Sequence, residues 1–184
     1  MKRRRIQYAD DDTRSMKFLL RLRIPSLVIG LLLGIVLSFI TSRFGAVISK
    51  NIAVAFFIPF VVYMAAAVGN QTQSIYVRDL KTGKASFKKY LFKESAIGFI
   101  LGLIFSLMTA LILLLWFKSV ELVLAVSLAT FGAIFSAPLI ALAVTEILEL
   151  EHSDPAVGAG PIASVIQDTV SVLIYGFIAT AIIL

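Results

Sequence analysis

Five long stretches of this sequence carry almost no charged side chain. Four of them lie between charged residues and are 19, 27, 23 and 24 residues long: 24–42, 51–77, 95–117 and 122–145. The fifth runs for 30 residues, 155–184, and is interrupted only by Asp168. An α-helix needs about 20 apolar residues to cross the hydrocarbon core of a bilayer, so each stretch is long enough. Because only 15% of the chain is charged, against roughly 25% in a soluble domain, the sequence predicts an all-α integral membrane protein with five transmembrane helices.

The same stretches define the domain organisation. We expect helices at approximately 24–42, 52–76, 95–117, 122–147 and 155–184, and together they form one transmembrane domain, residues 24–184. Residues 1–23 form a basic cytosolic arm that is too short to be a folded domain. This arm is either a solvated tail or an interfacial helix that leads into the first span.

Small residues recur at four-residue spacing in two of the expected spans. They are Gly30 and Gly34 in the first span, and Gly98, Gly102 and Ser106 in the third. Small side chains at this spacing let two helix backbones approach closely in lipid. We therefore expect tight helix packing along both of these faces.

The net charge of +6 is concentrated in the N-terminal arm and in residues 78–93. These two basic regions lie on the same side if the first two helices both cross the membrane, and the positive-inside rule assigns that side to the cytoplasm. An odd number of spans then leaves the C-terminus outside. Topology accounts for the basic charge, so we expect no nucleic-acid partner. Glu94, at the start of the third span, is expected to pair with Lys93 or with another cation at headgroup level.

The residues needed for catalysis inside a membrane are missing from the sequence. The chain has no cysteine and one histidine, which excludes disulfides, thiolate metal sites and multi-histidine metal sites. It contains no H-E-x-x-H pattern, and no second aspartate lies inside a span to form a two-carboxylate protease site. No serine and histidine are placed for nucleophilic catalysis within the bilayer. We predict that the chain is not an enzyme.

Asp168 is the residue that most strongly indicates a function. It follows Pro161 by seven residues and therefore lies about 10 Å into a helix that rises 1.5 Å per residue. An ionised carboxylate at this depth costs at least a few kcal/mol unless it faces water, a cation or a partner. Helical spacing places Ser164, Ser171 and Tyr175 on its stripe, whereas no Lys or Arg lies within the five spans to pair with it. The pattern favours a cation or proton pathway over a static buried pair.

A cation pathway needs oxygen ligands, and two spans supply them. Asp168 and Ser164 are the candidate metal ligands, and the expected pathway residues around them are Gln167 and Ser171 in the last span and Asn70, Gln71 and Thr72 in the second. Hard divalent ions prefer oxygen, and Mg²⁺ keeps several waters while touching one or two carboxylates. A two-fold homodimer with the pore on its axis would present two such aspartates.

Two segments of the chain resemble one known family. The segment Pro59–Arg78, PFVVYMAAAVGNQTQSIYVR, is similar to a signature in the second helix of the MgtE family of magnesium channels. The segment that begins at Asp154, DPAVGAGPIASVIQDTVSVLIY, resembles the fifth helix of the same family. Both segments fit without gaps, and the resemblance covers residues 24–184.

This resemblance implies a homodimer in the cell membrane of a bacterium or archaeon that conducts Mg²⁺ through a pore between the two protomers. The pore would be lined by spans 52–76 and 155–184 of both chains. The family's pore aspartate corresponds to Asp168, and Asp154 corresponds to an acidic position near the cytosolic mouth that binds divalent ions. Asp154 followed by Pro155 is also a favourable start for a helix, and the two roles are compatible.

The sequence departs from the family pattern in two respects. Ala65, Ala66 and Ala67 stand where the family has Gly-Gly-Asn, so a pore contact at Ala67 must differ and the preferred divalent ion stays open. Family members usually carry a large cytosolic Mg²⁺-sensing region, whereas this chain has 23 residues before its first expected span. Gating is then absent, supplied by a separate regulatory subunit, or carried out by the acidic loop 146–154. A non-transporting membrane scaffold and a cation-coupled carrier of another solute are the alternative functions.

Overall fold

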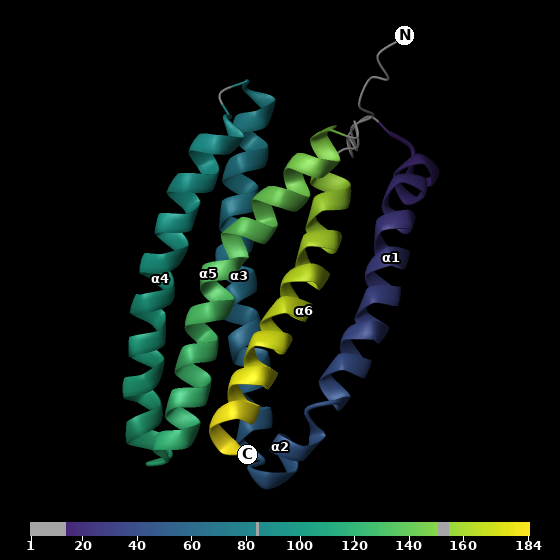
Figure 1. Cartoon of the computed structure of the whole chain (residues 1–184). Helices are drawn as coiled ribbons and strands as arrows, with labels where there is room; N and C mark the ends of the chain where they lie inside the picture. The colour runs from purple at the N-terminus through teal and green to yellow at the C-terminus, as the bar shows by residue number, and fades with distance from the viewer. Residues whose placement is uncertain (1–13, 84, 151–154) are drawn as a thin grey trace.

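The computed structural model describes residues 14–83, 85–150 and 155–184, and every regular element in them is an α-helix (Figure 1). The helices are α1 (Met16–Ser42), α2 (Gly45–Lys50), α3 (Ala53–Lys81), α4 (Phe87–Trp116), α5 (Val120–Leu150) and α6 (Pro155–Ile183). Five of them are long and apolar enough to cross a membrane, all but the six-residue α2. The expectation of an all-α protein with five membrane spans is confirmed for the described residues.

The helix boundaries follow local sequence signals. The Ser15 side chain accepts a hydrogen bond from the backbone N–H of Phe18 and caps the start of α1, as serine does at many helix N-termini. The helix therefore begins at Met16 and continues through residue 24, where the first span was expected to start. Proline at the first position of α6 needs no hydrogen bond for its nitrogen. At the other end of α6, the Lys50 ammonium donates to the Ile183 carbonyl, which stabilises the carbonyl-rich end of the helix.

Helix α5 is the centre of the bundle. It packs against α3, α4 and α6. Of its apolar 18-residue segment, 56% is buried inside the protein, the highest share among the five candidate spans. The side chains that it contributes to the core are mostly small: Ala125, Val126, Ala129, Ala133, Ile134 and Ala137 are each 0% exposed. Alanine lets neighbouring helices approach closely, and in lipid this close packing drives helix association.

The contact between α4 and α5 confirms one of the two expected small-residue faces. A methyl group at Gly98 would lie 3.2 Å from the Phe135 carbonyl oxygen, and one at Gly102 would lie 3.1 Å from that of Phe131. A methyl group at either position would therefore be crowded against the backbone of α5, so the two helices approach closely here. The expected face on α1 is different: a methyl group at Gly30 would have its nearest neighbour, in Val165, at 3.9 Å, and one at Gly34 would meet nothing within 4 Å.

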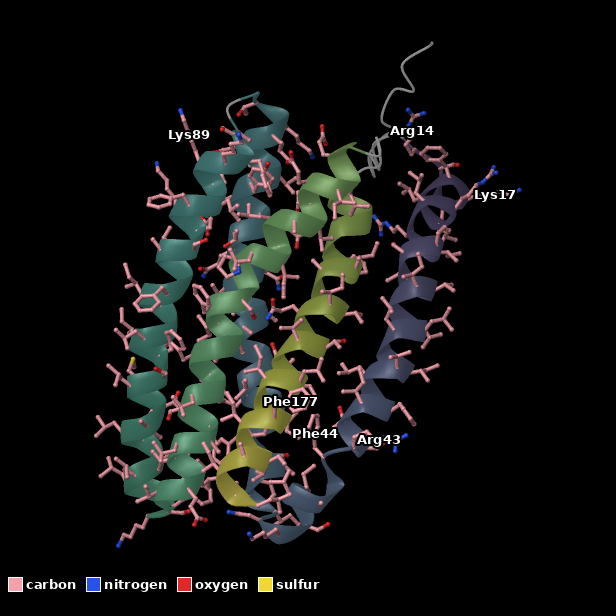
Figure 2. All side chains as sticks on the ribbon, in the orientation of Figure 1. Arg14, Lys17, Arg43, Phe44, Lys89 and Phe177 are labelled. Atoms are coloured by element: carbon pink, nitrogen blue, oxygen red, sulfur yellow. The ribbon has the colours of Figure 1, made fainter. Side chains whose placement is uncertain are left out.

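Helix α1 stands at the side of the bundle and packs mainly on α6 (Figure 1). Only 6% of its apolar 18-residue segment is buried inside the protein. The link from α1 to α2 is anchored at Phe44, whose ring meets the ring of Phe177 edge to face with centroids 5.6 Å apart (Figure 2). Most side chains of α1 thus lie outside the protein core, and the chain rejoins the core at Phe44.

The charged side chains gather at the two ends of the bundle. Figure 2 shows Arg14, Lys17 and Lys89 at the end where α1 begins, and Arg43 toward the opposite end, where α6 finishes. Apolar side chains cover the helices between these ends, and many of those that the structure describes are exposed, among them Leu31, Leu107 and Leu111. An exposed apolar belt with polar ends fits a protein that sits in a bilayer.

Candidate ion pathway

The polar residues of α6 divide between two directions. Gln167 and Ser171 are buried, at 4% and 0% exposure. The Gln167 amide nitrogen donates to the Ala133 carbonyl of α5 at 3.3 Å and to the Ser171 hydroxyl at 3.1 Å. Ser171 donates in turn to the carbonyl oxygen of Gln167 at 2.8 Å. These two side chains therefore face α5 inside the protomer, and their assignment to an ion pathway stays a prediction.

Asp168 points in another direction because successive helix residues are about 100° apart. It lies seven residues, or nearly two full turns, before Tyr175, whose hydroxyl donates to the Val54 carbonyl of α3 at 2.7 Å. It lies three residues after Val165, which is the nearest neighbour of Gly30 on α1. The register therefore places Asp168 on the side of α6 between α3 and α1. Its side chain is half-buried, and no residue that the structure describes forms a hydrogen bond or ion pair with it.

The expected pathway residues on α3 also face different ways. Asn70 and Gln71 are exposed, and Ala67 is half-buried. Thr72 is 3% exposed and donates to the Glu94 carboxylate of α4 at 2.7 Å. Asn70 and Gln71 thus lie on a surface of the protomer, whereas Thr72 contributes to the contact between α3 and α4.

One small cavity brings the polar segments of α3 and α6 together. Its volume is about 10 Å³, and it lies where α3, α5 and α6 meet. Its polar lining residues are Asn70 and Gln73 on α3, and Ser164 and Gln167 on α6. Ala66, one of the three alanines at the departure from the family signature, also borders it. The structure therefore places the two predicted pathway segments side by side.

A second polar cluster lies at the end of the bundle where α3 finishes. Tyr76 of α3 donates to the Glu146 carboxylate of α5 at 2.5 Å, and Tyr90 of α4 donates to Asp79 of α3. The two tyrosine rings are in contact, with centroids 4.8 Å apart. These bonds tie α3 to both α4 and α5 at this end of the bundle.

The role of Glu94 differs from the one expected from the sequence. Glu94 was expected to pair with Lys93 or a headgroup-level cation, but it is 8% exposed and accepts a hydrogen bond from Thr72. Helical periodicity would have placed Glu94 on the stripe of Gly98 and Gly102, which packs inward. That stripe was the sequence signal for its burial.

The candidate ligands do not form a preassembled metal cage. Among the described residues, no group of three or more His, Cys, Asp or Glu side chains is arranged to hold a metal ion. Asp154, the second predicted acidic ligand, lies outside the described residues. A single half-buried carboxylate suits transient contact with a hydrated ion better than tight chelation.

The fold and the site define a multi-pass helical membrane protein with a carboxylate and an amide-rich segment inside its apolar spans. Residues 58–178 match the model of the MgtE family, described as a divalent cation transporter, and the chain belongs to this family. The match confirms the resemblance seen in the two sequence segments. It also supports the prediction that the chain is not an enzyme, because the family is one of transporters.

Three curated relatives are similar to this chain, and each is named magnesium transporter MgtE. The protein of Bacillus subtilis is 28% identical over 164 residues, which cover 88% of this chain and 36% of the relative. The protein of Enterococcus faecalis is 29% identical over 86% of this chain and 36% of the relative. The protein of Thermus thermophilus is 28% identical over 83% of this chain and 34% of the relative. The chain thus spans about a third of the length of the curated relatives it matches.

Proposed function

We propose that this chain forms the membrane pathway of a divalent cation transporter and that Mg²⁺ is its main cargo. The observation that carries the proposal is Asp168, a carboxylate within an apolar span that no described residue neutralises. An ionised group at such a position costs several kcal/mol unless water or a counter-ion reaches it. A passing cation supplies that compensation, and the names of the curated relatives point to Mg²⁺.

A homodimer completes the pathway in this proposal. One protomer offers a single Asp168, and α3, which packs against α6, carries exposed polar side chains, among them Asn70, Gln71 and Ser74. Amide groups facing hydrocarbon would be unfavourable, because lipid provides no hydrogen-bond partners. Two copies related by a two-fold axis would place these α3 and α6 faces opposite one another and enclose water between them.

Mg²⁺ passes such a site with most of its hydration shell in place. The ion dehydrates reluctantly and is usually bound through one or two carboxylates and several waters. The two Asp168 carboxylates of the dimer accept hydrogen bonds from the ion's waters and balance its double charge. Ser164 and Asn70 extend the polar lining from α6 to α3. A membrane potential supplies about 4.6 kcal/mol per 100 mV for a doubly charged ion, so transport needs no nucleotide.

The basic end of the bundle is cytoplasmic in the proposed orientation. The described residues at this end include Arg14, Lys17, Arg21, Lys88 and Lys89, whereas the opposite end carries Arg43, Lys50 and Lys118 as cations. The excess of basic residues marks the cytoplasmic side. Because the chain has no native cysteine, single cysteines at Ser42 and Ser86 test the orientation directly with a membrane-impermeant thiol reagent. Labelling from the outside is expected at position 42 and not at position 86.

Neutralising Asp168 tests the ion pathway. The Asp168→Asn variant keeps the size of the side chain and removes its charge. We expect a loss of at least tenfold in potential-driven Mg²⁺ influx, measured in proteoliposomes with an enclosed Mg²⁺ indicator. The matched control is Glu121→Gln, which neutralises an exposed carboxylate at one end of α5 and is expected to transport normally.

The same assay distinguishes a transporter from the alternative function, a non-transporting membrane scaffold. A scaffold predicts no flux from the unmodified chain in any ionic gradient. Unchanged influx through a normally assembled Asp168→Asn variant would refute the assigned role of the carboxylate. Replacing external Mg²⁺ with Mn²⁺, Co²⁺ or Ca²⁺ in the unmodified protein gives the order of preference among divalent ions.

A further inference from the structure

Gln167 holds a buried polar atom that the protein itself does not satisfy. The side chain is 4% exposed, and its amide oxygen has no hydrogen-bond partner among the described residues. The orientation of the amide is fixed, because the Ala133 carbonyl can only accept and the nitrogen must therefore face it. A buried acceptor without a partner is rare in native proteins and calls for an explanation.

The residue that carries the unpaired oxygen, Gln167, borders the small cavity between α3, α5 and α6. Gln167 borders this cavity, whereas the two groups that bind its nitrogen, on Ala133 and Ser171, do not. The nitrogen is bonded to groups outside the cavity lining, so the oxygen is the polar atom of Gln167 that remains available to the cavity. Asn70, Gln73 and Ser164 complete the polar lining, and each of these side chains carries both a donor and an acceptor.

We infer that this cavity binds one water molecule, which donates to the Gln167 amide oxygen and bridges α6 to the polar segment of α3. A volume of about 10 Å³ is near the lower limit for a single water, and a buried water needs two to four polar partners. Four polar side chains border the cavity, so that number is available. Asn70 is exposed and Gln73 half-buried, which gives the water a route from the surface.

A metal ion fits the cavity less well than water. The cavity lining contains no carboxylate, so an ion there would have no charge compensation. Mg²⁺ also requires six oxygen ligands at about 2.0–2.1 Å in octahedral geometry, for which a cavity of this volume has no room. The inferred water site does not include Asp168; it shares Asn70 and Ser164 with the proposed ion pathway but needs no transported ion.

The first test is a structure of the full chain in lipid nanodiscs at a resolution that shows ordered water. One density peak is expected in the cavity, at hydrogen-bonding distance from the Gln167 amide oxygen. The inference is overturned if other buried waters are resolved but this peak is missing. It is also overturned if a peak there gains scattering when Mn²⁺ replaces Mg²⁺ in the buffer.

The second test is a double-mutant cycle in the detergent-solubilised full chain. Ala163→Val fills the cavity from α6, where Ala163 is 5% exposed and borders it. In the unmodified chain this change displaces the water and leaves the Gln167 oxygen unsatisfied, so the Tm is expected to fall by about 3 °C or more. In a Gln167→Met background no amide remains, and the same change is expected to leave the Tm unchanged or to raise it.

Equal effects of Ala163→Val in the two backgrounds overturn the inference, because a dry cavity or simple overcrowding would act in both. Ser171→Ala provides the matched control. It removes one partner of the Gln167 nitrogen without touching the cavity lining. In a Ser171→Ala chain, the effect of Ala163→Val on the Tm should therefore still differ between Gln167 and Gln167→Met.

Discussion

The hydrogen bond between Thr72 and Glu94 joins two buried side chains near one end of the bundle. Glu94 is 8% exposed and Thr72 is 3% exposed, so water does not readily replace a lost partner. Removing one member leaves a buried polar group unsatisfied, which typically costs 1–3 kcal/mol, whereas replacing both with apolar groups of similar shape is nearly neutral. This asymmetry makes the pair a sensitive probe of the packing between α3 and α4.

We expect Thr72→Val to lower the free energy of unfolding by about 2 kcal/mol, because Glu94 loses its donor. The double variant Thr72→Val, Glu94→Leu should recover most of the loss. Both are measured by denaturation in mixed micelles. The control is Thr109→Val on α4, where the hydroxyl is also buried and, among the described residues, bonds to the Phe105 carbonyl of its own helix alone. A cost for Thr109→Val equal to that for Thr72→Val would contradict the interhelical role.

Lys118 adopts an unfavourable backbone conformation in the turn between α4 and α5. Its φ is +53°, in the left-handed region that costs a residue with a Cβ about 1 kcal/mol or more relative to glycine. We expect Lys118→Gly to raise the free energy of unfolding by about 0.5–1 kcal/mol, measured by thermal denaturation in detergent. Lys118→Ala removes the same charge but keeps the Cβ, so it should give no such gain. Similar stabilisation by both variants would assign the effect to charge.

Individual side-chain directions were the least predictable part of the site. Asn70 and Ser164 were expected to share a pathway, and they do border one cavity. Thr72 and Ser171, expected in the same pathway, are bonded inside the protomer to Glu94 and Gln167. Helical spacing gives the residues that share a stripe but not the neighbour that the stripe faces. In a membrane protein, the lipid-facing and protein-facing sides are both apolar, so hydrophobicity does not resolve the choice.

At the scale of elements, the corner between α1 and α2 depends on a glycine in α6. A methyl group on Gly176 would overlap the ring of Phe44, closer than real Cβ atoms approach other atoms. Phe44 also packs against the hydrophobic core, so its ring cannot shift without disturbing neighbouring side chains. Gly176 therefore allows the chain to fold back onto α6 after the first span.

We expect Gly176→Ala to displace the Phe44 ring and to destabilise the protein by about 1–3 kcal/mol, as overpacking generally does. Phe44→Leu should relieve most of this penalty in the double variant, and thermal denaturation of the four chains measures the coupling. Gly34→Ala is the control, since a methyl group there meets nothing within 4 Å. It should be neutral or slightly stabilising, because alanine favours the helix over glycine. Additive effects at Gly176 and Phe44 would contradict the steric account.

The existence of the helices was more predictable than their mutual arrangement. Charge-free stretches of sufficient length identified all five candidate spans, because the bilayer fixes the length that a helix needs. The spacing of Gly98 and Gly102 correctly predicted a close contact, which α4 makes with α5. The same spacing in α1 did not lead to a close contact at Gly34. Small residues permit an approach, but which helix approaches is decided by the whole bundle.

At the scale of the whole molecule, the bundle has two unlike sides. Helix α4 turns large apolar side chains outward, among them Leu107 at 62% exposure, as expected of a surface in contact with lipid. The α3 and α6 surfaces, in contrast, carry exposed amides and the half-buried Asp168. We propose that the second side faces a partner copy across a two-fold axis.

The proposed dimer predicts that two copies of position 168 lie near one another. Asp168→Cys, in a chain without other cysteines, should form a covalent dimer with a short bifunctional thiol reagent in membranes. Leu107→Cys is the control on the lipid side and should remain monomeric. The products are separated by non-reducing electrophoresis. Dimer formation at position 107 together with none at position 168 would assign the interface to the other side of the bundle.

The length of α5 has a consequence for the surrounding lipid. Its 31 residues extend over about 46 Å, whereas the hydrocarbon core of a typical bilayer is about 30 Å thick. The last turns, with Glu146 and Glu149, must therefore reach the headgroups or force the helix to tilt. Glu146 accepts the hydrogen bond from Tyr76 of α3. A change in the tilt of α5 would therefore alter this contact between the two helices. The acyl-chain length of the surrounding lipid is therefore expected to change the tilt of α5 and, with it, the contact between α5 and α3.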